Sequence, residues 1–283
     1  MNQLKLFDDN KKILSRYGRT DLVFKSAKSI LSPTSGFLDT YDYSLNPYSG
    51  CGFACTYCYA AFFTWDKTKQ ENWGYWVEVK ENALALLRKK RKRPLINKTI
   101  YMSSVTDPYQ PIEKKLELTR SLLIEFQKYH QVNLVIQTRS PYVVRDIDIL
   151  QKMPSVQVNM TVTTDSERVR KLFEPSCPNY KQRLKAIQKV KAAGIRSCIT
   201  MTPLLPIEDA HSFGQRIAET AVDHTIVQYF HATKGQFVAG TREKALRLIN
   251  ELSWTPEKYE EVKVILKQYL PNLTEGKKGF SQK

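Results

Sequence analysis

Residues 46–59 read Asn-Pro-Tyr-Ser-Gly-Cys-Gly-Phe-Ala-Cys-Thr-Tyr-Cys-Tyr, and they hold three of the five cysteines of the chain. Cys51, Cys55 and Cys58 follow the spacing Cys-x3-Cys-x2-Cys. A [4Fe–4S] cluster takes one cysteine thiolate per iron. Three thiolates on one short loop therefore suit such a cluster, and they leave one iron open to a ligand that is not part of the protein.

Zinc and disulfides are the other common uses of clustered cysteines. A structural zinc ion takes four protein ligands, and the side chains that could complete such a set are all distant in sequence: Cys177, Cys198, His130, His211, His224 and His231. The cysteine count is odd, and residues 1–7 are too short and too polar for a signal peptide, so we expect no disulfide framework. A cluster loop is therefore favoured over both alternatives.

The composition is typical of a compact cytoplasmic enzyme. The chain has 283 residues, of which 42% are hydrophobic, and a chain of this length can bury a sizeable core. It contains no apolar run long enough to span a bilayer. We therefore expect a cytoplasmic protein with no membrane partner, and the sequence leaves the oligomeric state open.

The charge is the second informative feature. There are 44 Lys and Arg against 28 Asp and Glu, a formal net charge of +16, which favours a polyanionic partner such as DNA or RNA. Residues 88–93 form an unbroken basic run. Such a run could be a solvated helix C-terminus, where cations are favoured. Six cations in a row exceed that need and favour a contact with phosphate.

Strands and helices alternate along the chain. Short apolar or alternating segments predict strands at 40–45, 99–103, 132–138, 156–164, 195–201 and 225–229. Apolar residues at helical intervals predict helices at 75–93, 116–129, 143–152, 180–193, 212–222, 241–252 and 256–269. The alternation predicts a parallel α/β sheet with helical crossovers, and periodicity leaves open whether it is a partial barrel or doubly wound. We expect few regular elements before residue 40 and a loose tail after Pro271.

The cysteine spacing, with an aromatic residue just before the third cysteine, resembles the cluster loop of radical S-adenosylmethionine (SAM) enzymes. The wider run resembles one branch of that superfamily, the spore photoproduct lyase-like, or DNA repair photolyase-like, proteins. Further runs similar to this branch are Ser-Val-Thr-Asp-Pro-Tyr-Gln-Pro-Ile-Glu at 104–113, Leu-Thr-Arg at 118–120, Thr-Arg-Ser at 138–140, Arg-Asp-Ile-Asp-Ile-Leu at 145–150, Phe-Glu-Pro at 173–175, Arg-Leu at 183–184 and Ala-Gly-Ile at 193–195. The resemblance extends over most of the chain.

The resemblance implies a partial (β/α)6 barrel of the TIM type, with the cluster loop after the first strand. It implies a short N-terminal extension at 1–39, a barrel core at 40–235 and a C-terminal helical extension at 236–283. Sites in parallel α/β folds lie at the carboxyl ends of the strands. The matched runs follow the expected strands, so we expect them to converge on one mouth.

The resemblance also implies the cofactors. Cys51, Cys55 and Cys58 would bind the [4Fe–4S] cluster, and its open iron would take the amino and carboxylate groups of SAM. One electron, supplied by a reductase or by a flavodoxin or ferredoxin, would split SAM into methionine and a 5′-deoxyadenosyl radical that abstracts hydrogen from the substrate. The protein's part would be to bind, orient and exclude water.

Further roles carry over position by position. Ser104 and Thr106 would face the methionine moiety of SAM. Arg139 stands where the family often has lysine, and either side chain could meet a carboxylate, arginine bidentately. Thr161 resembles a SAM-contacting serine. These four residues are therefore candidate SAM-binding residues.

Two tyrosines flank Cys58. The matching tyrosines of the family are implicated in relaying a hydrogen atom, which makes Tyr59 the candidate catalytic residue. We expect Tyr57 to pack around the cluster and the adenine of SAM, which makes it a further candidate cofactor-binding residue beside the four above. The cysteine that returns a hydrogen atom in the family is replaced here by Ser104, whose O–H bond is too strong for that step. The two remaining cysteines, which we expect to be buried structural residues, are the other candidate donors.

These features predict a radical SAM enzyme, lyase-like and linked to DNA repair, that acts on a nucleic-acid-type substrate. An RNA- or protein-modifying radical SAM enzyme is one alternative, and a basic nucleic-acid-binding module with a structural metal is another. The few remaining cysteines argue against a second iron–sulfur cluster. Aromatic residues after the loop would either stack on bases or pack locally: Phe62, Phe63, Trp65, Trp73, Tyr75 and Trp76.

Overall fold

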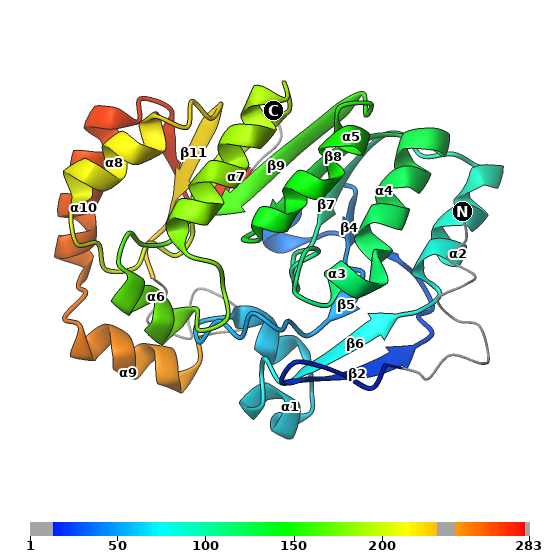
Figure 1. Ribbon diagram of the computed structural model, residues 1–283, viewed down its shortest axis with the longest axis horizontal. Helices are drawn as coiled ribbons and strands as arrows, with labels where there is room; N and C mark the ends of the chain where they lie inside the picture. Colours follow the sequence, from blue (N-terminus) through cyan, green and yellow to red (C-terminus); the bar gives the residue numbers. More distant parts are fainter. Residues whose placement is uncertain (1–13, 231–240, 281–283) are drawn as a thin grey trace.

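The computed structural model describes residues 14–230 and 241–280, and its central feature is an eight-stranded sheet (Figure 1). In spatial order the strands are β12 (Leu273–Glu275), β11 (His224–Val227), β10 (Arg196–Met201), β9 (Ser155–Thr161), β8 (Gln131–Thr138), β7 (Ile96–Met102), β4 (Tyr43–Leu45) and β3 (Leu31–Pro33). Every neighbouring pair is parallel except β3 with β4. The six strands from β4 to β11 confirm the predicted parallel sheet, and the sheet of the described residues is open, as in a partial barrel.

Helices connect these strands and cover the sheet. They are α2 (Ala83–Arg88), α3 (Glu113–Leu116), α4 (Leu118–Tyr129), α5 (Ile147–Leu150), α6 (Glu167–Phe173), α7 (Tyr180–Ala192), α8 (Ala210–Ala218), α9 (Glu243–Glu251) and α10 (Pro256–Tyr269). Helices α4, α5 and α7 lie together over one side of the sheet (Figure 1). Leu122, Leu123 and Phe126 form the buried stripe of α4, so the helical periodicity of the sequence marks the side that packs on the sheet.

The N-terminal region is more regular than the sequence suggests. Strands β1 (Arg16–Tyr17) and β2 (Thr20–Lys25) join β6 (Trp76–Lys80) and β5 (Tyr48–Ser49) in a second sheet of order β1-β2-β6-β5. The expectation of few regular elements before residue 40 is therefore wrong. The helix expected at 75–93 is also wrong in its first third. Residues 76–80 form β6, which pairs with β2 and β5, and its side chains alternate in burial with the two-residue period of a strand.

Residues 272–280 are ordered, in contrast to the loose tail expected from sequence after Pro271. Strand β12 extends the main sheet beside β11, and α11 (Lys277–Phe280) follows it. Phe280 packs into a small core on the sheet, and its carbonyl accepts a hydrogen bond of 2.8 Å from the Tyr41 hydroxyl. Burial of this aromatic ring fixes a segment whose polar composition alone predicts disorder.

No helix within residues 14–230 and 241–280 combines the length and the apolar character that a bilayer crossing requires.

Candidate active site

The cysteine loop lies at the carboxyl edge of the main sheet. It follows β4 and β5, while the loops that carry Ser104, Thr106 and Arg139 follow β7 and β8. Thr161 is the last residue of β9. Since parallel strands end at the same edge, the structure places these predicted site residues around one mouth.

The three loop cysteines are close enough to influence one another. Burial raises the pKa of Cys51, and the neighbouring Asp107 and Cys55 raise it further. Burial and Cys55 raise the pKa of Cys58 to about 11, against the opposing effect of Arg139 and Arg242. Thiols with a raised pKa lose their protons readily only when a metal cation binds the thiolate that forms.

The fit of the three cysteines to an iron–sulfur cluster depends on their shared loop and on the charges around it. In the part of the chain that the structure describes, no three His, Cys, Asp or Glu side chains converge on one metal-ion position. The three thiols instead share one loop and one electrostatic environment, with Arg139 and Arg242 as nearby cations. This arrangement fits a group that takes one thiolate on each of three irons.

The loop after β7 holds the backbone of the cysteine loop. The Thr106 hydroxyl donates to the Gly50 carbonyl at 2.7 Å, and Asn46 Nδ2 donates to Ser104 Oγ at 3.2 Å. Asn46 Oδ1 accepts from the Val105 N–H at 3.1 Å. The Thr-Asp-Pro-Tyr-Gln-Pro run therefore supports the loop, in addition to the SAM contacts that the sequence predicts.

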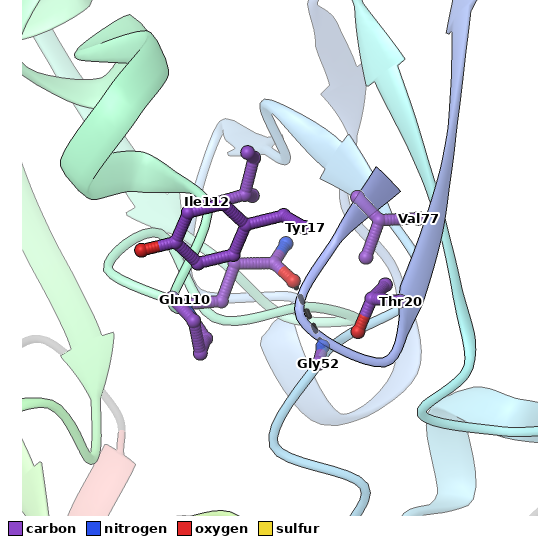
Figure 2. Close-up of a pocket in the computed structure, with 7 residues that line it drawn as sticks. Tyr17, Thr20, Gly52, Val77, Gln110 and Ile112 are labelled. Atoms are coloured by element: carbon purple, nitrogen blue, oxygen red, sulfur yellow. Dashed lines mark hydrogen bonds between the residues drawn. The ribbon is translucent and has the colours of Figure 1, made fainter. Parts of the chain in front are cut away.

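Figure 2 shows a small pocket beside Gly52 of the cysteine loop. The Gly52 N–H donates to Gln110 Oε1 at 2.9 Å, and Tyr17, Thr20 and Val77 of the second sheet lie behind it. The cavity between them measures about 10 Å³, which is near the lower limit for one water molecule. This cavity is therefore too small to hold a substrate molecule.

Thr161 lies in a polar ladder across four strands, β7, β8, β9 and β10. Its hydroxyl accepts a hydrogen bond of 2.7 Å from Gln137 Nε2, which also donates to Thr200 Oγ1 at 2.9 Å. The Tyr101 hydroxyl donates to Gln137 Oε1 at 2.8 Å. The role predicted for Thr161 rests on the family resemblance alone, and the structure adds this set of neighbours.

A buried carboxylate that sequence reasoning left without a role connects the loop to the barrel. Glu174 is fully buried and accepts hydrogen bonds from Tyr57, Arg139, Thr163 and Arg183. Burial alone would raise its pKa, but the two guanidinium groups and the hydrogen bonds hold the pKa at about 2. The sequence contains a signal for this residue, the Phe-Glu-Pro run at 173–175. The chemical role of Glu174 nevertheless depends on partners that are distant from it in sequence.

Arg139 is tied into the same network. Its Nη1 lies 2.8 Å from Glu174 Oε1 and donates to the Tyr57 hydroxyl at 2.8 Å. The Arg139 side chain is 17% exposed, so it lies just below the surface of the mouth. Tyr57 is buried, as the packing interpretation expects.

Tyr59 has a different environment from Tyr57. Its ring is half-exposed and lies edge-on to Phe63, with centroids 6.0 Å apart. Its hydroxyl donates to the Ser104 carbonyl. The structure therefore joins the candidate catalytic tyrosine to the loop that carries the serine in place of the family's cysteine.

The two remaining cysteines occupy unlike positions, although both are buried as expected. Cys177 Sγ lies 3.7 Å from Cys55 Sγ and 3.9 Å from the Phe53 carbonyl. Cys198 lies in the small core around Tyr41 and Phe280. Only the first of the two touches the cysteine loop.

The basic run lies far from the mouth. It ends α2 and precedes β7, so it sits at the amino edge of the sheet, opposite the cysteine loop. Arg91 makes two hydrogen bonds of 2.6 Å to Glu125 and lies over the Tyr129 ring at 3.5 Å. The remaining cations of the run are exposed, so it is part ion pair and part open basic surface.

The aromatic residues after the loop divide into two groups. Trp73 is buried and packs edge-on against Trp76 at 5.6 Å, which supports local packing for this pair. Phe63 is 63% exposed and Trp65 is fully exposed. Large exposed aromatic rings beside a mouth are available for contact with a partner.

The comparisons with known proteins agree with this geometry. The radical SAM superfamily model matches residues 45–218. An uncharacterised protein of Methanocaldococcus jannaschii is 35% identical over 189 residues, which are 66% of this chain and 69% of that protein. One from Acidianus two-tailed virus is 27% identical over 205 residues, 67% of each chain.

Solved structures show the same fold. Spore photoproduct lyase complexed with dinucleoside spore photoproduct is similar at a TM-score of 0.60 and 16% identity, over 90% of this chain and 81% of that one. Streptococcus suis SuiB bound to precursor peptide SuiA is similar at 0.51 and 13%, over 82% and 48%. The matched family model covers more than half of the chain and includes all three loop cysteines, and the chain therefore belongs to the radical SAM superfamily of enzymes, with a fold like that of spore photoproduct lyase.

Proposed function

We propose that this enzyme binds a [4Fe–4S] cluster through Cys51, Cys55 and Cys58, binds SAM beside it, and abstracts a hydrogen atom from a nucleic-acid-type substrate. The observation that carries the proposal is the placement of three thiols on one supported loop at the mouth of a radical SAM barrel. The bound cluster and SAM would supply a 5′-deoxyadenosyl radical, with one electron from a flavodoxin, a ferredoxin or another cytoplasmic reductase.

The residues around the loop divide the remaining work. Thr106 and Gln110 hold the loop backbone through Gly50 and Gly52. We assign Ser104, Thr106, Arg139 and Thr161 to the SAM side of the mouth, from their place at the strand ends. The Arg139 guanidinium offsets the negative charge of the thiolates, because it lies within electrostatic reach of Cys55 and Cys58.

We propose that the Tyr59 hydroxyl exchanges a hydrogen atom with the substrate bound at the mouth. Its half-exposed ring and its hydrogen bond to the Ser104 carbonyl place it between the loop and solvent. A phenolic O–H is weak enough to give up a hydrogen atom, whereas the hydroxyl of Ser104 is not. A Tyr59→Phe variant would therefore cleave SAM but release less product.

The substrate assignment rests on charge and on exposed aromatic rings. The net charge of +16 favours a polyanion, and Phe63 and Trp65 could stack on unpaired bases. Among proteins of similar fold, one is complexed with a dinucleoside and one with a peptide. DNA repair is the proposed role, and modification of RNA or protein is the outcome to exclude.

The test is anaerobic reconstitution with iron and sulfide, reduction by dithionite, and measurement of 5′-deoxyadenosine from SAM. Formation that is lost in Cys55→Ala and kept in Cys198→Ala is expected. Stimulation by ultraviolet-irradiated DNA would support repair, whereas stimulation by RNA or protein alone would redirect the substrate. Absence of both SAM binding and product in the iron-loaded wild type would overturn the proposal.

A further inference from the structure

The cysteine loop is held from below by a segment more than a hundred residues away in sequence. The Thr56 N–H donates to the Phe173 carbonyl at 2.8 Å, and the Tyr57 hydroxyl donates to Glu174. Cys177 Sγ contacts Cys55 Sγ at 3.7 Å. Three contacts in a row therefore dock loop residues 55–57 on residues 173–177, which are the last residue of α6 and the four residues after it.

Glu174 is the centre of this contact. Its Oε1 accepts hydrogen bonds from Tyr57 of the cysteine loop and from Arg139 of the loop after β8. Its Oε2 accepts a hydrogen bond of 2.5 Å from Arg183 of α7. Arg183 Nη1 also donates to the Thr161 carbonyl at 3.2 Å. One carboxylate thereby connects the cysteine loop with the ends of two neighbouring strands.

The charges explain why a carboxylate is needed at this position. The Arg139 and Arg183 side chains are 17% and 1% exposed, and the Glu174 side chain is fully buried. Removing the carboxylate that these two guanidinium groups share would leave two buried cations without this counter-charge, which is strongly unfavourable. The guanidinium groups would then move, and the Tyr57 hydroxyl would lose its acceptor.

We infer that Glu174 is a positioning residue of the cluster site: through Tyr57 and Arg139 it fixes the loop between Cys55 and Cys58 before the cluster arrives. The inference rests on the proposed function for its consequence in cluster assembly. The positioning itself is a property of the protein without cofactors, and it is measurable there.

The experiment is hydrogen exchange of the cluster-free protein, followed residue by residue or by peptide over 51–59. In Glu174→Gln, exchange of these amides is expected to be roughly tenfold faster, as lost charge-assisted hydrogen bonds would allow. Glu125→Gln is the matched control, because Glu125 is equally buried and pairs with Arg91 at the opposite edge of the sheet. It should lower global stability without changing exchange in the loop.

Tyr57→Phe is the second variant, in case Glu174→Gln does not fold. It removes one hydrogen bond to Glu174 and leaves no buried charge unpaired, so the fold should persist while the loop loosens. Reconstituted Glu174→Gln is expected to hold less iron and to give a broader paramagnetic resonance spectrum of the reduced cluster than Glu125→Gln.

The outcomes separate the two proposals. Equal loop exchange in wild type, Tyr57→Phe and Glu174→Gln would overturn the positioning role, whatever the protein binds. Wild-type protein that binds no cluster, but whose loop loosens in the two variants, would overturn the proposed function and leave the positioning role standing.

Discussion

At the scale of single residues, the cysteine loop depends on a position that tolerates only glycine. Gly50 has φ +79°, a left-handed conformation, and a Cβ built on it would lie 2.6 Å from the Trp76 carbonyl oxygen. Its own carbonyl accepts the Thr106 hydrogen bond. The glycine just before the first cysteine is therefore required by backbone geometry and by close packing on β6.

Gly50→Ala is expected to lower the free energy of unfolding by at least about 2 kcal/mol, from strain plus the clash. Gly18→Ala is the control, since Gly18 also has a positive φ but its Cβ would meet nothing within 4 Å. Strain alone should cost this control about 1 kcal/mol. Chemical denaturation measures both, and equal losses would show that contact with Trp76 is unimportant.

Glu174 gives a pH dependence at the same scale. Its pKa is lowered from 4.5 to about 2 in the folded protein. A lowered acid pKa means stability that is present above the unfolded pKa and lost as the pH falls toward the folded one. We expect about 3 kcal/mol of stability to disappear between about pH 4.5 and about pH 2.

The measurement is the difference in unfolding free energy between wild type and Glu174→Gln across that pH window. The difference should shrink as the pH falls, because protonation removes the same charge that the substitution removes. A difference that is constant from pH 7 to the acid limit of folding would contradict the assignment. Other carboxylates titrate alike in both proteins, so they cancel in the difference.

At the scale of elements, the C-terminal segment completes the main sheet. Strand β12 pairs with β11, and Phe280 of α11 lies against Phe37 with ring centroids 5.3 Å apart. The Tyr41 hydroxyl donates to the Phe280 carbonyl, which links the segment just before β4 to the last described residue. Composition predicts a loose tail here, because a single aromatic residue in a polar segment gives no periodic signal.

Phe280→Ala should therefore destabilise the whole protein by about 3 kcal/mol, as for other buried aromatic rings. Val264→Ala is a suitable control, because Val264 is 57% exposed on α10 and should cost less than about 0.5 kcal/mol. Thermal unfolding compares the two. Equal melting temperatures would mean that α11 is dispensable for the fold.

At the scale of the whole molecule, the two surfaces that we propose for nucleic acid lie apart. Phe63 and Trp65 are exposed beside the cysteine loop, whereas the basic run at 88–93 lies at the opposite edge of the sheet. A phosphate contact at the run would bring nucleic acid to the protein but not to the mouth.

The division of the chain into 1–39, 40–235 and 236–283 stays a proposal, and the pairing of β2 with β6 ties residues 20–25 to the barrel core.

The two surfaces predict different effects on binding of a single-stranded oligonucleotide. Trp65→Ala should weaken binding by roughly tenfold at every salt concentration, since stacking on one base contributes about 1–3 kcal/mol. Replacing Lys89, Lys90 and Lys92 by alanine should reduce the salt dependence of binding instead. Fluorescence anisotropy at several salt concentrations distinguishes them, and unchanged binding in both variants would exclude both surfaces.

The sequence by itself determined the features that are local in the chain. The Cys51, Cys55 and Cys58 spacing and the matched runs established the superfamily, and alternating periodicities established a parallel α/β sheet, since both signals need only near neighbours. The tertiary structure alone decided which distant groups meet. Tyr57 and Glu174 are 117 residues apart, and their contact depends on how α6 packs beneath the loop. The same packing separates the basic run from the mouth, because position around a barrel is set by chain topology and not by composition.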